Sequence, residues 1–155
     1  MALRNVVRND NEFLGKKSRP VTQFDDKLAA LIDDMRDTLR KEQGAGLAAP
    51  QVGILRRIFI ADLNCDGEIL KEFINPEIIS KTGKNDRYLE GCLSYPGRSF
   101  RIVRANKVKM RAQDVKGEWF EITAEDFLAR CLLHEYDHLE GITIPMIGDE
   151  VFENE

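Results

Sequence analysis

The two histidines of this 155-residue chain lie four positions apart, His134 and His138, in the segment LLHEYDHLEG. Each residue of an α-helix turns by about 100°, so these two side chains would lie about 40° apart on one helix face. Both imidazoles can then bind one metal ion, with the carboxylate of Glu135 beside them as an acid or base. Such a pair can also be a half-exposed helix face, but the intervening glutamate and the lack of other histidines favour a metal site.

A catalytic metal site of this kind needs a third protein ligand and an open position for water. Glu150, Glu153 and Glu155 belong to an acidic tail that we expect to be solvated. Cys131 shares the helix face with the histidines, yet it lies roughly 10 Å along the axis from His138, whereas metal–ligand bonds are only about 2.0–2.3 Å. We therefore interpret Cys131 as apolar lining beside the site.

The other two cysteines have different surroundings. Cys65 lies in LNCDGE, where it enters a hairpin turn, and we expect a small, partly buried side chain there. Cys92 lies in YLEGCLSYPG, between Gly91 and Pro96, in a stretch that is neither a good helix nor a plain strand. Glycine permits a close approach of the backbone to a ligand. The pattern favours Cys92 as the third ligand, with one thiolate and two imidazoles around a divalent cation.

Composition limits the class of protein. The chain is 43% hydrophobic and 32% charged, which suits a single domain over residues 1–155. The net charge of −4 argues against a nucleic-acid partner, because phosphates require clustered lysine and arginine. No apolar run is long enough for a signal peptide or a membrane span, and three widely spaced cysteines suit a reducing compartment. We expect a cytoplasmic monomer without a membrane partner.

The hydrophobic pattern predicts an α+β fold. Residues 25–43 carry an apolar stripe at spacings of three and four, typical of an amphipathic helix packed on a sheet, and Gly44 and Gly46 should end that helix. The stripe consists of Leu28, Leu31, Ile32, Met35 and Leu39. Short strands are predicted at residues 56–62, 71–79, 99–104, 107–113 and 118–123.

The metal-binding segment should form the last helix of the chain. Thr123, followed three positions later by Asp126, predicts a capped start, and Gly141 predicts the end. We therefore expect a single compact domain of short, mainly antiparallel strands packed around this C-terminal helix, with an amphipathic helix near the N-terminus.

Three segments taken together resemble the peptide deformylase family: GAGLAAPQ at 44–51, EGCLS at 90–94 and HEYDH at 134–138. They occur in the family's order and approximate spacing, and the resemblance extends to INPEII and Arg104 and covers nearly the whole chain. It implies hydrolysis of the formyl group from the N-terminal formylmethionine of newly made bacterial proteins. The partners would be N-formylmethionyl peptides and nascent chains, including chains near the ribosome.

Carried over by position, the resemblance makes Cys92, His134 and His138 the metal ligands and Glu135 the general acid–base. It favours iron(II) in the cell, with zinc, nickel or cobalt as replacements, and a ligand set of one thiolate and two imidazoles suits all four metals.

The resemblance also implies groups that act on the substrate. The Gln51 side chain and the Leu93 backbone N–H would stabilise the developing oxyanion. Backbone groups of the 44–51 segment and of Gly91 would pair with the peptide as if it were an added strand. Cys131 would line the methionine pocket. The residues expected along the peptide are Gly44, Ala45, Gly46 and Gly91.

Two residues depart from the family pattern. Leu133 replaces a common glutamine before the first metal histidine, which removes a polar group close to the ligands. Tyr95 replaces a small aliphatic residue directly after EGCLS, and its larger ring could narrow the entrance to the cleft.

Four alternatives stay open on the sequence alone. Cys65 could complete a closed structural zinc site. The two histidines and their glutamate could belong to a peptidase that cleaves internal bonds. Cys92 could act as a nucleophile with a histidine base in a thiol hydrolase. The glycine-rich 44–51 segment could bind phosphate, although it lacks the Gly-Lys-Ser/Thr ending of a phosphate loop.

Overall fold

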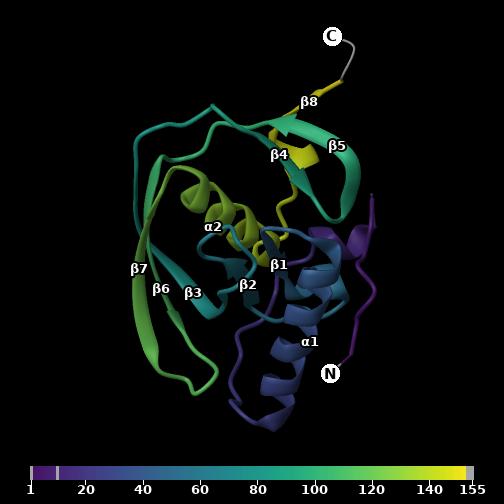
Figure 1. Ribbon diagram of the computed structural model, residues 1–155, viewed down its shortest axis with the longest axis vertical. Coiled ribbons are helices and arrows are strands. Elements are labelled where there is room, and N and C mark those ends of the chain that lie inside the picture. The colour runs from purple at the N-terminus through teal and green to yellow at the C-terminus, as the bar shows by residue number, and fades with distance from the viewer. Residues whose placement is uncertain (1, 10, 153–155) are drawn as a thin grey trace.

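The computed structural model describes residues 2–9 and 11–152, and within them eight strands form two antiparallel sheets (Figure 1). The large sheet has the order β1-β2-β3-β6-β7 and the small sheet the order β4-β5-β8. The large sheet comprises β1 (Gly46–Ala48), β2 (Ile58–Asp62), β3 (Leu70–Thr82), β6 (Lys107–Gln113) and β7 (Trp119–Glu125). The small sheet comprises β4 (Leu89–Cys92), β5 (Tyr95–Arg101) and β8 (Asp149–Val151).

Two long helices pack against the large sheet: α1 (Asp26–Glu42) and α2 (Asp126–Leu139). Three short helices complete the fold: η1 (Glu12–Gly15), η2 (Ala49–Val52) and α3 (Ile144–Ile147). In Figure 1, α2 lies between the large sheet and the small sheet, while α1 lies near the N-terminus. The predicted α+β domain is thus confirmed.

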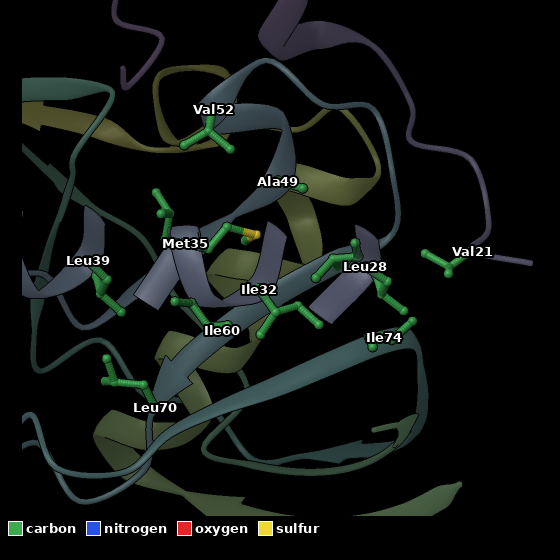
Figure 2. Close-up of a cluster of buried hydrophobic side chains, with 12 residues drawn as sticks. Val21, Leu28, Ile32, Met35, Leu39, Ala49, Val52, Ile60, Leu70 and Ile74 are labelled. Atoms are coloured by element: carbon green, nitrogen blue, oxygen red, sulfur yellow. The ribbon is translucent and has the colours of Figure 1, made fainter. Parts of the chain in front are cut away.

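Alternation along β2 explains why the two long helices lie on different faces of the large sheet. Successive strand side chains point to opposite faces. Ile58 and Ile60 pack into a core cluster with α1, as Figure 2 shows for Ile60, whereas Phe59 and Ala61 pack into a second cluster with α2. β2 is therefore buried on both faces and forms the centre of the molecule.

The predicted N-terminal helix is confirmed, and its apolar stripe is buried except for Leu31, which is half-buried against the same core. Asp25 is the N-cap, and its Oδ1 accepts a hydrogen bond of 3.0 Å from the Leu28 N–H. The helix ends before either glycine, because Gln43 takes the left-handed conformation that stops it. Gly44 follows that stop, and Gly46 begins β1.

We expect Asp25→Ala to lower the free energy of unfolding by about 1 kcal/mol, because the Leu28 N–H loses its capping acceptor. Urea unfolding would measure the loss. Lys27→Ala, at an exposed position in the same turn, serves as the control and should not destabilise the protein. An unchanged unfolding midpoint for Asp25→Ala would contradict the capping role.

The strand predictions agree best with the long strands of the large sheet. β3 and β6 cover the predicted segments 71–79 and 107–113, β2 starts two residues later than predicted, and β7 runs from 119 to 125 rather than from 118 to 123. The strand predicted at 99–104 starts earlier and ends at Arg101. Arg104 instead forms an isolated bridge with Asn85. The short strands β1, β4 and β8 were not predicted, because three or four residues carry too little alternation to reveal a period.

The predicted start of the metal-binding helix is wrong. Thr123 lies within β7, opposite Lys109, and the helix begins at Asp126 after Glu125. In the described part of the chain Glu125 makes no side-chain capping bond. Pairing of β7 with β6 through its last residue therefore outweighs the local capping pattern, whereas the predicted end is confirmed by the left-handed Gly141 just beyond the helix.

The small sheet has a core cluster of its own, which joins η1, β5 and α3. Tyr95 is buried in this cluster with Leu14 and Phe100, and it is not among the residues that line the large cleft described below. The ring of Tyr95 therefore does not narrow the entrance to that cleft.

The acidic tail is only partly as expected. Glu150 lies in β8, where its carboxylate accepts hydrogen bonds of 3.0 and 2.8 Å from Arg98, so it is paired rather than freely solvated. Glu153 and Glu155 lie outside the described residues. Among residues 2–9 and 11–152, no helix combines the length and apolar character that crossing a membrane requires.

Candidate active site

Three segments that are distant in the sequence meet at one cleft of about 430 Å³. The segment 44–51 reaches the cleft through β1 and η2, the hairpin of β4 and β5 contributes the turn around Cys92, and α2 contributes the histidine face. The predicted site residues on its lining are Gly44, Ala45, Gly46, Gln51, Gly91, Cys92, Leu93, Cys131, His134 and Glu135. His138 contacts this set through Cys92, because its Nε2 lies 3.4 Å from the Cys92 Sγ.

Cys92, His134 and His138 form the candidate metal centre. One ligand atom from each lies within 4.8 Å of the others, and among the described residues no other group of three such side chains gathers in this way. The two imidazole rings are 5.0 Å apart, between centroids. Cys65 is not part of the group; it is exposed rather than partly buried, which does not favour the closed four-ligand zinc site.

The donor atoms fit a divalent metal. His134 Nδ1 donates to Glu90 at 2.9 Å, which leaves Nε2 of the same ring to face the centre. His138 is 1% exposed, and its Nε2 faces the thiol of Cys92. Buried polar atoms are normally paired. One nitrogen of each imidazole and the Cys92 sulfur lie close enough together to share one ion, and such a mixed set suits zinc, iron(II), cobalt and nickel.

The pKa values of the two histidines shift in opposite directions because their neighbours differ. Burial and the nearby His134 and Arg104 hold the pKa of His138 well below its usual value. A neutral imidazole is the form that binds a metal. Burial would also lower the pKa of His134, but Glu135, Cys92 and Glu90 outweigh it and hold that pKa well above the usual value.

Glu90 orients His134, and it is the functional residue that the sequence reasoning missed. Its buried carboxylate accepts hydrogen bonds of 2.8 and 2.9 Å from Arg104 as well as the bond from His134. Burial alone would raise the pKa of Glu90, yet these hydrogen bonds lower it below its usual value. A carboxylate on the second nitrogen of a metal-binding histidine fixes the ring and its tautomer. The signal available was a glutamate two positions before Cys92 on a short strand.

Glu135 lies beside the metal centre without belonging to it. The residue is 4% exposed, and its Oε2 lies 3.9 Å from His134 Nε2. Its Oε1 has no hydrogen-bond partner among the residues that the structure describes. Burial raises the pKa of Glu135 to about 7, so the carboxyl group can both take and release a proton near neutral pH.

Gly46 makes room for that carboxylate. A Cβ atom at this position would lie 2.6 Å from Glu135 Oε2 and 2.9 Å from its Cγ, closer than any side chain tolerates. β1 can approach α2 only because Gly46 has no side chain. The need for glycine at position 46 is thus explained by the nearby side chain of Glu135.

Gln51 and Leu93 both adjoin Cys92, the first through the fold and the second in the sequence. Gln51 accepts a hydrogen bond of 3.0 Å from the Ala48 N–H through Oε1, which turns its Nε2 toward Ser94 Oγ at 3.1 Å and Cys92 Sγ at 3.5 Å. Leu93 directly follows Cys92 in the turn between β4 and β5. Both potential donors therefore lie next to the candidate metal centre.

The cleft is bordered by two edge strands, β1 of the large sheet and β4 of the small sheet. The Ala45 carbonyl already accepts from the Asp62 N–H at 2.9 Å inside the large sheet. In an antiparallel strand, the N–H and C=O groups of successive residues point alternately toward and away from the partner strand. The backbone groups of Gly46, the next residue, therefore point away from β2 and toward the cleft edge of β1. The segment 44–51 forms a strand edge and a short helical turn rather than a phosphate loop, which argues against the phosphate alternative.

Cys131 and Leu133 both behave as apolar residues. Cys131 is half-buried on the cleft lining, and burial raises the pKa of its thiol to about 12, so the thiol stays neutral. It does not join the group of metal-binding side chains. Leu133 is buried in the second core cluster, where an aliphatic side chain packs against the large sheet.

Comparison with known proteins agrees with this geometry. The family model described as polypeptide deformylase matches residues 3–149. Peptide deformylase 1 of Clostridium perfringens is 51% identical over 142 residues, which are 92% of this chain and 95% of that protein. The peptide deformylase of Natranaerobius thermophilus is 43% identical over 155 residues, which are 100% of this chain and 98% of that protein.

Solved structures agree in fold. The crystal structure of a peptide deformylase from Legionella pneumophila has a TM-score of 0.90 at 42% identity, over 94% of this chain and 86% of that one. The peptide deformylase from Thermotoga maritima also gives a TM-score of 0.90, at 36% identity, over 95% of this chain and 98% of that one. Agreement in family model, sequence and fold over almost the whole chain has one meaning: this chain belongs to the peptide deformylase family.

Proposed function

We propose that this chain removes the formyl group from N-formylmethionyl peptides at a metal centre held by Cys92, His134 and His138. Peptide deformylases are metal-dependent enzymes that act on the formylmethionine of newly made proteins, and this chain is an enzyme of that family. The observation that carries the assignment of residues is the convergence of one thiol, two imidazoles and the buried Glu135 carboxyl at one cleft.

Each side chain of the cleft has a distinct task in this proposal. A divalent metal bound there would acidify a water molecule and polarise the formyl oxygen. Glu135 holds the proton taken from the attacking water and delivers it to the leaving amine, for which a pKa near neutrality is suited. The Gln51 amide and the Leu93 N–H donate to the developing oxyanion.

The peptide would lie in the cleft as an added strand. Main-chain groups of Gly46 on one edge and Gly91 on the other would pair with the substrate backbone, while Gly44 and Ala45 border its path. The neutral thiol of Cys131 would line the pocket that receives the methionine side chain.

The metal and the cellular setting are part of the same proposal. We propose iron(II) as the metal in the cell, replaceable by zinc, nickel or cobalt, because the mixed thiolate and imidazole set accepts all four. We also propose that residues 1–155 act as one catalytic domain and as a monomer in the bacterial cytoplasm. Its substrates there would be nascent chains near the ribosome.

Formate release from an N-formylmethionyl peptide tests the function. Protein purified without oxygen is expected to release formate, to lose activity with a metal chelator and to regain it when iron(II), nickel or cobalt is added back. The matched control is the same peptide with an acetyl group in place of the formyl group, which should not be cleaved. No formate from folded, metal-loaded protein would contradict the proposal.

One rival has a specific observation in its favour. Cys92 Sγ lies 3.4 Å from His138 Nε2, and a thiol beside an imidazole is also the arrangement of a thiol hydrolase. The chelator experiment separates the two functions, because a thiol hydrolase would keep its activity without metal.

A further inference from the structure

Arg130 is a buried cation with no task in the chemistry described above. It is 2% exposed and lies on α2, one turn before His134. Its Nη1 donates to Glu90 Oε2 at 2.6 Å and to the Ile102 carbonyl at 2.9 Å, and its Nη2 donates to the Asn85 carbonyl at 2.6 Å. Burying a guanidinium is costly unless such contacts compensate, so the contacts of Arg130 hold it in one orientation.

The two oxygens of Glu90 each bind a different residue of α2. His134 Nδ1 lies on Oε1 at 2.9 Å, and Arg130 Nη1 lies on Oε2 at 2.6 Å. Residues four apart lie on one helix face, so the carboxylate holds α2 at two points about one turn apart. A single contact would allow α2 to rotate about that point on β4. Two contacts fix both the position of α2 along its axis and its rotation relative to β4.

This double contact joins the two elements that carry the metal ligands. Cys92 lies two residues beyond Glu90 on β4, while the two histidines lie on α2. Metal–ligand bonds of about 2.0–2.3 Å tolerate only small errors in the separation of β4 and α2. We propose that Arg130 is a positioning residue that sets this separation and thereby the geometry and the retention of the metal. The inference rests on the proposed function, which supplies the metal centre.

Arg104 also connects Glu90 to α2, but at a different point of the helix. It bonds both oxygens of Glu90 and the carboxylate of Asp137, which lies three residues beyond His134, whereas Arg130 lies one turn before His134. The Glu90 carboxylate and both guanidinium groups are buried together, with the half-buried Asp137 beside them, so removing one cation would leave a buried charge less well compensated. A test therefore needs a variant of Arg130 that keeps the charge.

Arg130→Lys keeps the charge but cannot reach three acceptors with a planar fork, and Arg130→Met removes both charge and donors. Each variant is loaded with cobalt(II), whose absorption reports the thiolate bond and the coordination geometry. We expect altered cobalt spectra and loss of cobalt to a chelator about 10–100-fold faster than in the wild type, with Arg130→Met the faster of the two.

Arg57→Met is the matched control. Arg57 also binds α2, through the Leu139 carbonyl at 3.1 Å and Glu140 at 2.8 Å, but at the far end of the helix from Glu90. It should leave the spectrum and the rate of cobalt loss unchanged. Equal effects of Arg57→Met would overturn the proposal, because they would indicate general loosening of the helix.

Two further results would count against the role of Arg130, and a third would count against the metal centre itself. Wild-type spectra and cobalt loss in folded Arg130 variants would overturn it directly. Failure of both variants to fold would make Arg130 a requirement of the fold and not a positioning residue. Absence of a cobalt–thiolate band in the wild type would overturn the proposed metal centre, and that failure is distinct because it does not depend on Arg130.

Discussion

Glu135→Gln is expected to reduce formate release by about 10²–10⁴-fold, because a glutamine amide keeps the shape of the side chain but cannot carry the proton. The metal should remain bound, since Glu135 is not one of the three side chains of the metal centre. KM should change little compared with kcat, because the loss falls on proton transfer. Formate release and metal content of the purified variant measure both effects.

The control for this change is Glu140→Gln. Glu140 directly follows α2 and pairs with Arg57, away from the cleft lining. It offers the same exchange of carboxylate for amide without a place in the chemistry, so its turnover should match the wild type. Near-normal turnover of Glu135→Gln would rule out Glu135 as the acid–base group.

Gly46→Ala is expected to lower kcat by about 10²-fold, although it adds one methyl group. The added Cβ would lie 2.6 Å from Glu135 Oε2, so the carboxylate must move. A displacement of about 1 Å in a reacting group can cost this much. Gly15→Ala is the control, because its Cβ would meet only the end of Met146 at 3.8 Å. Steady-state formate release and the unfolding midpoint should be measured for both variants.

A double-mutant cycle decides whether Gly46 acts through Glu135. If it does, Gly46→Ala should cost far less in the Glu135→Gln background than in the wild type, because the displaced group no longer moves a proton. Equal losses in both backgrounds would mean that the methyl group blocks the substrate instead.

The sequence reveals the chemistry of this chain better than its architecture. His134, Glu135 and His138 could be predicted together because a helix repeats within one turn, and that regularity is visible in a short segment. Cys92 could be predicted as the third ligand because the other cysteines were out of reach or in a turn. The cluster of these side chains agrees with that choice.

What could not be predicted are contacts between segments distant in the sequence. The local sequence around Glu90 and Arg130 does not indicate that their side chains are in contact. That contact depends on how α2 packs against the hairpin of β4 and β5. The predicted start of α2 was wrong for a similar reason. Pairing of β7 with β6 extends to Glu125, and this pairing outweighs the local capping pattern. Long-range geometry also explains Gly46, whose neighbour Glu135 is 89 positions away.

The two strand edges along the cleft have a consequence for the range of peptide sequences that the enzyme accepts. Main-chain hydrogen bonds recognise an extended backbone whatever its side chains are. An enzyme that holds its substrate through the edges of β1 and β4 would therefore read the identity of the first residue and remain largely indifferent to those that follow. One catalyst of this design could serve the diverse N-termini of an entire proteome.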